Sequence, residues 1–285
     1  TGGNDKGDLM DGVLDLVANV LARAKVDFSV FAEVEPDPKI EVALAAAEAA
    51  KAAGPDLIVG LGGGSSLDIS KVTSVLTTNP GPVDKYFGME MVPQAGVPLI
   101  LIPTTAGTGS EMTSICVLSD TKNNVKKGIV SEHMFARAAL LDPQLTLALP
   151  PRVTAMTGMD ALVHAIESFV GVRASIFTDT LNLKAIRLVA ENLRPAYANG
   201  ANLAARENML HASCLAGMAF SNTQNGLDHA MALAIGGKFH LPHGLLTAFI
   251  LPWVMEYNLI AAPQKYIGIA KAFGERPKRM SQIEA

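Results

Sequence analysis

The 285-residue sequence predicts an N-terminal α/β domain with a mostly parallel sheet over residues 1–149, followed by an all-α domain over residues 150–285. Two patterns support this prediction. Up to about residue 149, short apolar runs alternate with segments of helical period, which is typical of strands joined by crossover helices. After Leu149-Pro150-Pro151, strand-like runs disappear and long segments with a 3.6-residue period replace them.

The predicted elements follow in order along the chain. Apolar residues at helical spacing predict a helix over 7–24, and alternation predicts a strand over 28–34. Further helices are predicted at 38–53 and after the glycine turn 62–65, and further strands at 56–61, 98–102, 114–118, 128–131 and 138–141. The helices predicted in the second half cover 153–171, 178–198, 202–220, 226–235 and 244–258.

The composition indicates a folded protein and excludes some classes of partner. An apolar fraction of 49% is enough to bury a substantial core. Lys and Arg number 23 against 27 Asp and Glu, so no excess of positive charge is available to hold a nucleic-acid backbone. The two cysteines, Cys116 and Cys214, cannot form a disulfide framework or a cysteine-rich metal site. We therefore expect a reduced, cytoplasmic setting.

The residues shown at the start of the sequence contain no charged segment followed by an apolar stretch, so no secretory signal is expected within them. No apolar run is long enough to span a bilayer, so no membrane partner is expected. The chain opens on Thr1-Gly2-Gly3, a glycine turn of the kind that follows a strand, and its last residues continue a helical pattern. We therefore expect the natural protein to extend beyond both ends of this sequence.

Two polar turns follow predicted strands. Gly62-Gly63-Gly64-Ser65 lies between a buried strand and a helix, where backbone N–H groups can hold a pyrophosphate. Taken alone, the same motif fits equally well a tight turn that needs only positive φ. The turn from Thr104 to Ser110 carries hydroxyls that suit phosphate or ribose, although such groups also satisfy their own backbone. Two such turns at the carboxyl ends of strands favour a nucleotide site.

Four residues form a candidate metal site. Asp160 and His164 are spaced i, i+4, so their side chains share one face of a helix. An ordinary hydrogen bond between them is the simpler explanation unless further ligands exist, and His229 and His243 supply such ligands. One oxygen and three nitrogen ligands suit Fe²⁺ or Zn²⁺ and leave room for a substrate oxygen, as in catalytic sites. His240, three residues before His243, is a candidate proton relay, with solvent exposure as the alternative.

Four segments together resemble the iron-containing, group III alcohol dehydrogenases. They cover 62–68, 103–111, 158–167 and 229–244, in the order and spacing of that family, and the resemblance extends over nearly the whole chain. The resemblance implies a dehydroquinate synthase-like fold, with an N-terminal dinucleotide-binding domain and a C-terminal helical metal-binding domain that is incomplete at its C-terminus. Members of the family have a strand and a helix before the position of Thr1 and more helices after that of Ala285.

The resemblance also implies site residues and a reaction. Asp160, His164, His229 and His243 match the metal ligands of the family. The implied cofactor-binding residues are Gly2, Gly63, Gly64, Ser65, Asp68, Thr104, Thr105, Thr108, Thr113, Lys126 and Leu145. The implied reaction is reversible hydride transfer between a primary alcohol or aldehyde and NAD or NADP, with Fe²⁺, or Zn²⁺ instead, polarising the substrate oxygen. The implied partner is a small-molecule alcohol or aldehyde, and a homo-oligomer is expected.

Two positions depart from the resembled family. Leu233 replaces a histidine that lies four residues after the His229 position and passes a proton to solvent, so we expect His240 to take this catalytic role. Gly2 occupies the position where members that prefer NAD carry an acidic residue for the ribose hydroxyls. Without that carboxylate, NADP should be tolerated or preferred, unless Asp5 restores selectivity.

Two other functions remain open from the sequence. A carbon–oxygen lyase resembling dehydroquinate synthase also uses a nicotinamide cofactor and a metal. Such a lyase would be expected to offer a glutamate ligand and several basic residues for a phosphorylated substrate, and Asp160 argues against it. The other alternative is a catalytically impaired, binding or assembly homologue, which Leu233 keeps open although all four ligand positions are retained.

Overall fold

The structure is a computed structural model that describes residues 7–239 and 241–275. Contacts divide the chain into two compact units. The first runs to Thr104 and resumes over Thr113–Leu145, and the second comprises Thr105–Met112 and the chain from Thr146 onward. Short 3₁₀ helices lie at Val83–Tyr86, Ser110–Met112, Glu132–Met134 and Pro143–Thr146.

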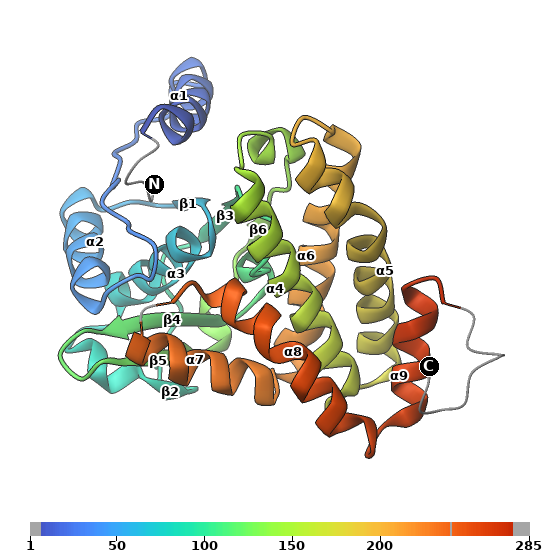
Figure 1. Ribbon diagram of the computed structural model, residues 1–285. Helices are drawn as coiled ribbons and strands as arrows, with labels where there is room; N and C mark the ends of the chain where they lie inside the picture. Colours follow the sequence, from blue (N-terminus) through green and yellow to red (C-terminus); the bar gives the residue numbers. More distant parts are fainter. Residues whose placement is uncertain (1–6, 240, 276–285) are drawn as a thin grey trace. The chain divides into compact units, whose positions relative to one another are not determined.

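The first unit contains a parallel sheet with the order β1-β3-β6 (Figure 1). The strands are β1 (Ile58–Gly62), β3 (Leu99–Pro103) and β6 (Ala138–Ala139), and Ile58 pairs with Leu99 in the register of β1 and β3. Helices α2 (Ile40–Ala53) and α3 (Gly64–Thr78) pack together, and α3 also packs against β1 and β3. Helix α1 covers Gly7–Arg23. Because α3 begins two residues after β1 ends, its N-terminus lies at the carboxyl end of the sheet.

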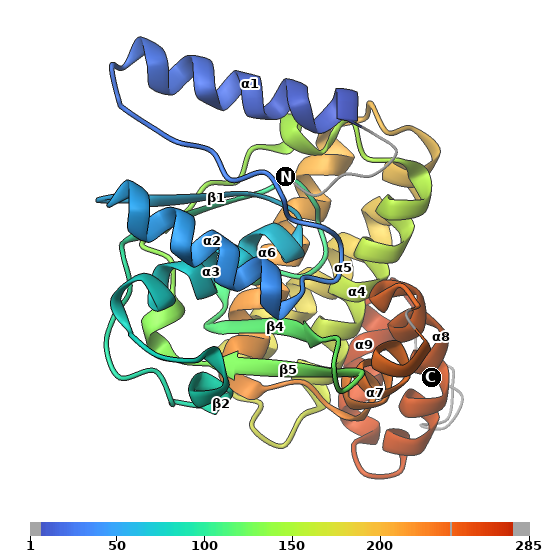
Figure 2. The ribbon, with the colours of Figure 1, turned by 90° about the vertical axis from the view of Figure 1, so that its left-hand side faces the viewer.

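A second sheet in the same unit has the order β2-β5-β4. Strands β4 (Ile115–Asp120) and β5 (Val125–Val130) form an antiparallel hairpin, seen side by side in Figure 2, and β2 (Gly88–Met89) pairs with β5 in parallel. Val72 and Val75 of α3 are fully buried with Cys116, Leu118 and Ile129 of the hairpin. The apolar face of the hairpin is therefore buried against α3.

The strand predicted over 28–34 is absent from the described structure. The segment from residue 24 to residue 35 contains neither helix nor strand, and Phe28 and Val30 remain 46% and 50% exposed. A cavity of about 920 Å³ is lined by this segment, β1, α1, α2 and α3. A strand requires a neighbour for its backbone hydrogen bonds, and among the described residues β1 pairs only with β3. The alternation of apolar residues therefore predicted a strand, but no strand of the described structure pairs with this segment.

The second unit is helical, as predicted. Its helices are α4 (Pro151–Val170), α5 (Ile176–Ala198), α6 (Leu203–Thr223), α7 (Leu227–Phe239), α8 (His243–Leu259) and α9 (Pro263–Ala272), the last of which was not predicted. Helices α4, α5 and α6 pack side by side (Figure 1), α8 packs on α4 and α7, and α9 packs on α5. Local signals explain the starts: Pro151 is the first residue of α4, Ser175 caps α5 in a capping box, and the side chain of Asn202 caps α6.

The turn over 105–112 packs against the helices of the second unit through glycines. A Cβ atom on Gly217 of α6 would lie 2.6 Å from the carbonyl oxygen of Gly109, and Gly109 itself has a φ of +58°. A side chain at either position would therefore displace the turn from α6. The hydroxyl of Ser213 also accepts a hydrogen bond from the backbone N–H of Gly109, at 3.1 Å.

The predicted fold class is confirmed: an α/β region with a mostly parallel sheet precedes an all-α region. Within the part of the chain that was searched, residues 7–239 and 241–275, no helix combines the length and apolarity that a bilayer span requires.

Candidate metal centre and cofactor-binding residues

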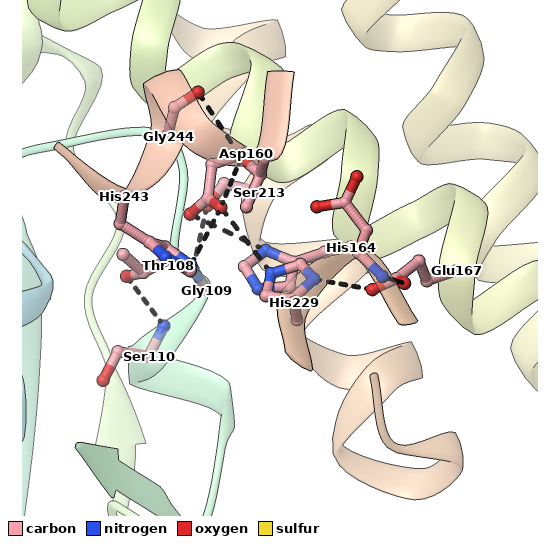
Figure 3. A network of polar contacts seen from close by, with 12 residues as sticks. Thr108, Gly109, Ser110, Asp160, His164, Glu167, Ser213, His229, His243 and Gly244 are labelled. Carbon is pink, nitrogen blue, oxygen red and sulfur yellow. Dashed lines mark hydrogen bonds and ion pairs between the residues drawn. The ribbon is translucent and has the colours of Figure 1, made fainter. Parts of the chain in front are cut away.

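Three of the four predicted metal ligands come together in the second unit (Figure 3). Asp160 lies on α4, His229 on α7, and His243 is the first residue of α8, and one donor atom from each lies within 4.8 Å of the other two. Asp160 Oδ1 is 3.7 Å from His229 Nε2 and 3.5 Å from His243 Nε2. Two ligands that are each about 2.0–2.2 Å from one tetrahedral ion lie about 3.4 Å apart, so these separations fit a shared ion.

The fourth predicted ligand, His164, lies beside this group. Its Nδ1 is 3.9 Å from Asp160 Oδ2, and its ring stacks on His229 and on Phe220 with centroid distances of 4.3 Å for each. Among the described residues, His164 Nδ1 and His229 Nε2 are buried without a hydrogen-bond partner. Buried ring nitrogens without partners are costly, and a metal ion would satisfy both.

Burial and neighbouring charges shift the pKa values of Asp160, His164 and His229. Burial by itself raises the pKa of Asp160, but the three surrounding histidines hold it below its ordinary value. Burial lowers the pKa of His164 to about 3, so this ring is neutral at pH 7. Burial also disfavours the charged form of His229, but the carboxylates of Asp160 and Glu167 raise its pKa to about 9. A metal ion bound here would therefore replace a proton on His229.

The residues fit a catalytic rather than a closed structural metal site. Asp160 and His229 are buried, whereas the side chain of His243 is 30% exposed. One carboxylate and three imidazoles provide the oxygen and nitrogen donors that Fe²⁺ and Zn²⁺ accept. The partial exposure of His243 leaves one side of the group accessible to a substrate oxygen.

Three further buried polar side chains surround the ligands, and none of them was predicted from the sequence. Thr247 Oγ1 lies 3.5 Å from Asp160 Oδ1, four residues along α8 from His243. Glu167 contacts His229 Nδ1 at 2.6 Å, three residues along α4 from His164. Burial raises the pKa of Asp228, next to His229, to about 7. Their helical spacing from the predicted ligands is the signal in the sequence by which Thr247 and Glu167 could have been found.

The first glycine turn suits a phosphate. Gly62 has a φ of +143°, and a Cβ atom there would lie 2.5 Å from Ser66 Oγ, so only glycine fits. Its carbonyl oxygen accepts a hydrogen bond from the N–H of Thr104 at 2.9 Å. Helix α3 starts at Gly64 with no side-chain cap and no acidic residue in its first turn. The first-turn N–H groups near Gly63, Gly64 and Ser65 are therefore suited to an anion.

Two of the predicted cofactor-binding residues, Asp68 and Thr113, belong to a network centred on Lys71, which is fully buried. Its Nζ lies 3.2 Å from Asp68 Oδ1 and donates to Thr113 Oγ1 at 3.1 Å and to the carbonyl oxygen of Ile115. Asp68 Oδ2 also accepts a hydrogen bond from the N–H of Val117 at 2.9 Å. The network joins α3 to β4, so it fixes Asp68 and Thr113 relative to the glycine turn.

The other predicted site residues belong to several elements of the two units. Lys126 Nζ is 2.5 Å from Asp37 Oδ1, and Leu145 is buried at the end of the first unit. In the second unit, the hydroxyl of Thr108 accepts a hydrogen bond from the N–H of Ser110 at 3.2 Å, and Thr105 precedes it in the same turn. Leu233 is half-buried on α7. Gly2 and His240 lie outside the described residues.

Comparisons with known proteins identify the family. The family model for iron-containing alcohol dehydrogenases matches residues 4–143, and the model for the C-terminal region of the Fe-containing alcohol dehydrogenase family matches residues 154–285. A sulfoacetaldehyde reductase of Bilophila wadsworthia is 51% identical over 266 residues, which are 93% of this chain and 69% of the relative. The chain therefore belongs to the iron-containing alcohol dehydrogenase family, which is a family of oxidoreductases that use a metal and a nicotinamide-type cofactor.

Other relatives and solved structures support the same family assignment. A 1,3-propanediol dehydrogenase of Citrobacter freundii is 44% identical over 283 residues, covering 99% of this chain and 73% of the relative. The crystal structure of a 1,3-propanediol oxidoreductase superposes with a TM-score of 0.94 at 42% identity, covering 98% of this chain and 73% of the other. A sulfoacetaldehyde reductase from Bifidobacterium kashiwanohense, solved in complex with NAD⁺, superposes with a TM-score of 0.79 at 30% identity. The match covers 93% of this chain and 76% of the reductase.

Proposed function

We propose that this chain catalyses the reversible oxidation of a primary alcohol to an aldehyde with NAD(P), at a metal site formed by Asp160, His164, His229 and His243. The observation that carries the proposal is the convergence of Asp160, His229 and His243 in a chain of this family, with two buried ring nitrogens that have no hydrogen-bond partner among the described residues. The proposed metal is Fe²⁺, with Zn²⁺ as the alternative, because both accept one carboxylate and several imidazoles.

The proposal assigns a task to each part of the chain. A bound metal would polarise the substrate oxygen, and the nicotinamide would carry the hydride. Asp160 and the three histidines would hold the metal. Because the side chain of His243 is partly exposed, the alcohol would reach the metal beside it. The proposed dinucleotide domain covers 1–149 and the metal domain 150–285. Gly63, Gly64 and Ser65 would bind pyrophosphate at the start of α3, with Thr104, Thr105 and Thr108 on phosphate and ribose.

The proposed proton route follows from the departure at Leu233. A leucine packs against a substrate or a ring but exchanges no proton, whereas alcohol oxidation releases one. We assign that proton to His240, which precedes the ligand His243 by three residues. The remaining predicted cofactor residues, Gly2, Asp68, Thr113, Lys126 and Leu145, stay part of the same proposal, with Gly2 leaving space for the 2′-phosphate of NADP.

The substrate class comes from the relatives. Relatives are named for sulfoacetaldehyde and for 1,3-propanediol, both of which are short molecules with an aldehyde or a hydroxyl group on a terminal carbon. We therefore propose a short-chain primary alcohol or aldehyde for this chain.

An activity screen tests this proposed function. The protein is purified without oxygen, loaded with Fe²⁺ or Zn²⁺, and assayed with sulfoacetaldehyde, 1-propanol and 1,3-propanediol in the presence of NAD(H) or NADP(H). We expect turnover of at least one of these compounds that disappears after chelation and returns on reloading. We also expect kcat/KM with NADP to be within a hundredfold of that with NAD, a limit equal to about 2.7 kcal/mol. Turnover that is indifferent to chelation would contradict the proposal.

A further inference from the structure

Glu167 is a buried carboxylate that lies against the metal ligands without being one of them. It belongs to α4, seven residues after Asp160 and three after His164, and its exposure is 3%. Residues at these spacings share one face of a helix. Glu167 therefore faces the same side of α4 as the two ligands that this helix contributes.

Both carboxylate oxygens of Glu167 are used, and both contact α7. Oε2 lies 2.6 Å from His229 Nδ1, and Oε1 accepts a hydrogen bond of 2.6 Å from the backbone N–H of Asp228. Asp228 is in the first turn of α7, where N–H groups lack partners within the helix. A side chain of α4 thus satisfies the start of α7 and contacts the ring of His229 with the same carboxylate (Figure 3).

The two nitrogens of the His229 ring face different carboxylates. Nδ1 contacts Glu167, whereas Nε2 points toward Asp160 at 3.7 Å and has no hydrogen-bond partner among the described residues. A carboxylate has no proton to donate, so the short contact with Glu167 requires the proton to be on Nδ1. Nε2 is then the ring nitrogen left for a metal ion, which would replace its proton, and it faces Asp160 Oδ1.

The backbone beside Glu167 leaves room for this arrangement. A Cβ atom on Gly226, just before α7, would lie 2.7 Å from Glu167 Oε1. Any larger residue there would push the carboxylate away from α7. The position of Glu167 therefore depends on a glycine that touches no ligand.

We infer that Glu167 is a positioning residue for the metal site: it holds the proton of His229 on Nδ1 and so presents Nε2 to the metal. The inference rests on the proposed function, because it concerns the same site. A carboxylate that orients a metal-binding histidine typically contributes 10- to 100-fold in metal affinity. Glu167 acts through His229 and is not a ligand itself.

Glu167→Gln is the most direct test, because glutamine keeps the shape and can still accept the hydrogen bond from Asp228. Its amide N–H group would then face Nδ1 and force the proton of the ring onto Nε2. We expect the affinity for Zn²⁺, measured by competition with a chromophoric chelator, to fall about 10- to 100-fold in this variant. If Glu167 only fills space, the glutamine variant binds Zn²⁺ within twofold of the wild type, and the inference is overturned.

Two further variants separate the effect of Glu167 on the orientation of His229 from a general loss of stability. Ser168→Ala removes the neighbouring hydroxyl on α4, which accepts hydrogen bonds from Asn182 and Thr223 and, among the described residues, forms none with a metal ligand. This control should lower Tm while leaving the affinity for Zn²⁺ within twofold. Gly226→Ala removes no polar atom, yet it should weaken Zn²⁺ binding by displacing Glu167. Equal loss of affinity in Ser168→Ala and Glu167→Gln would overturn the inference.

The wild type alone provides a test that does not depend on the folding of any variant. In the Zn²⁺-loaded protein with ¹⁵N-labelled histidine, NMR should show His229 protonated on Nδ1 and metal-bound through Nε2. The opposite tautomer would overturn the role of Glu167 while leaving the proposed function intact. A wild type that binds no metal would instead overturn the proposed function.

Discussion

The molecule contains two buried clusters of charged groups, and they differ in what satisfies them. In the first unit, the ammonium of Lys71 contacts Asp68, Thr113 and the carbonyl oxygen of Ile115, all supplied by the protein. In the second unit, Asp160 is surrounded by histidines, and two buried ring nitrogens, His164 Nδ1 and His229 Nε2, have no hydrogen-bond partner among the described residues. The comparison indicates that the Lys71 cluster supports the fold, whereas the Asp160 cluster is built to bind something else.

The largest expected effect is the loss of the metal in His229→Ala. This variant removes the imidazole that contacts both Asp160 and Glu167, so metal retention and turnover should be lost together, with turnover falling about 10³-fold or more. Metal content by elemental analysis and kcat/KM are measured on the same sample. His211→Ala, which changes an exposed histidine of α6, is the matched control. Full metal occupancy with near-normal activity in His229→Ala would contradict the assignment of the Asp160 cluster to metal binding.

The Lys71 cluster should respond in stability instead of metal binding. Lys71→Met leaves the Asp68 carboxylate without its buried cation, which typically costs about 3–5 kcal/mol in the free energy of unfolding. Denaturant unfolding measures this cost, and chelator competition should show unchanged metal affinity. Lys51→Met, which breaks an exposed ion pair with Glu48, should cost less than about 1 kcal/mol. Equal costs in the two variants would contradict the assignment of Lys71 to the fold.

A third effect concerns the proton route beside the metal ligands. His240→Ala should lower kcat about 10²-fold, at the lower end of what a positioned acid–base group contributes, without loss of metal. Leu233→His, added to this variant, should restore part of kcat, because position 233 shares a helix face with His229. The pH dependence of kcat is recorded for all three proteins. An unchanged pH profile in His240→Ala would leave solvent as the proton acceptor.

The smallest expected effect is a pH-dependent loss of stability at the β4–β5 turn. Hydrogen bonds and the ion pair with Lys127, together with bonds from Asn123, hold the pKa of Asp120 well below its ordinary value. A carboxyl whose pKa is depressed in the folded state stabilises the fold above its unfolded pKa of about 3.9, and this stabilisation disappears as the pH falls further. Asp120→Asn should therefore be less stable than the wild type at pH 7, and the difference should shrink below about pH 4. A difference that does not change with pH would exclude this ion pair as its cause.

Local patterns predicted most of the fold from the sequence. Helical periods located α4 to α8 to within a few residues, because the local sequence carries both the recurrence of apolar residues and breaks such as Pro150-Pro151 before α4. The prediction of a strand over 28–34 was wrong, because a strand needs a neighbouring strand to pair with, and the alternation of apolar residues does not show whether one is present. The short strand β2 was missed, since two residues carry no period.

The candidate metal centre was predictable only in part. Asp160 and His164 share a helix and were found by their spacing, and His229 and His243 were added from the sequence as further ligands, which the resemblance then matched to those of the family. The contact between Glu167 and His229 spans 62 residues of sequence, and helical spacing gave no hint of the partner on α7. The same limit applies to Lys71, whose contacts with Thr113 and Ile115 join α3 to a strand more than 40 residues away.

The most direct test of the metal centre is a titration of the metal-stripped protein with Fe²⁺ or Zn²⁺ under anaerobic conditions, followed by calorimetry and thermal unfolding. Asp160→Ala, which removes the carboxylate that all three histidines approach, is titrated in parallel. We predict one equivalent of metal per wild-type chain with a rise in Tm, and no saturable binding in Asp160→Ala. A wild type that binds no metal, or a variant that binds as tightly as the wild type, would contradict the account.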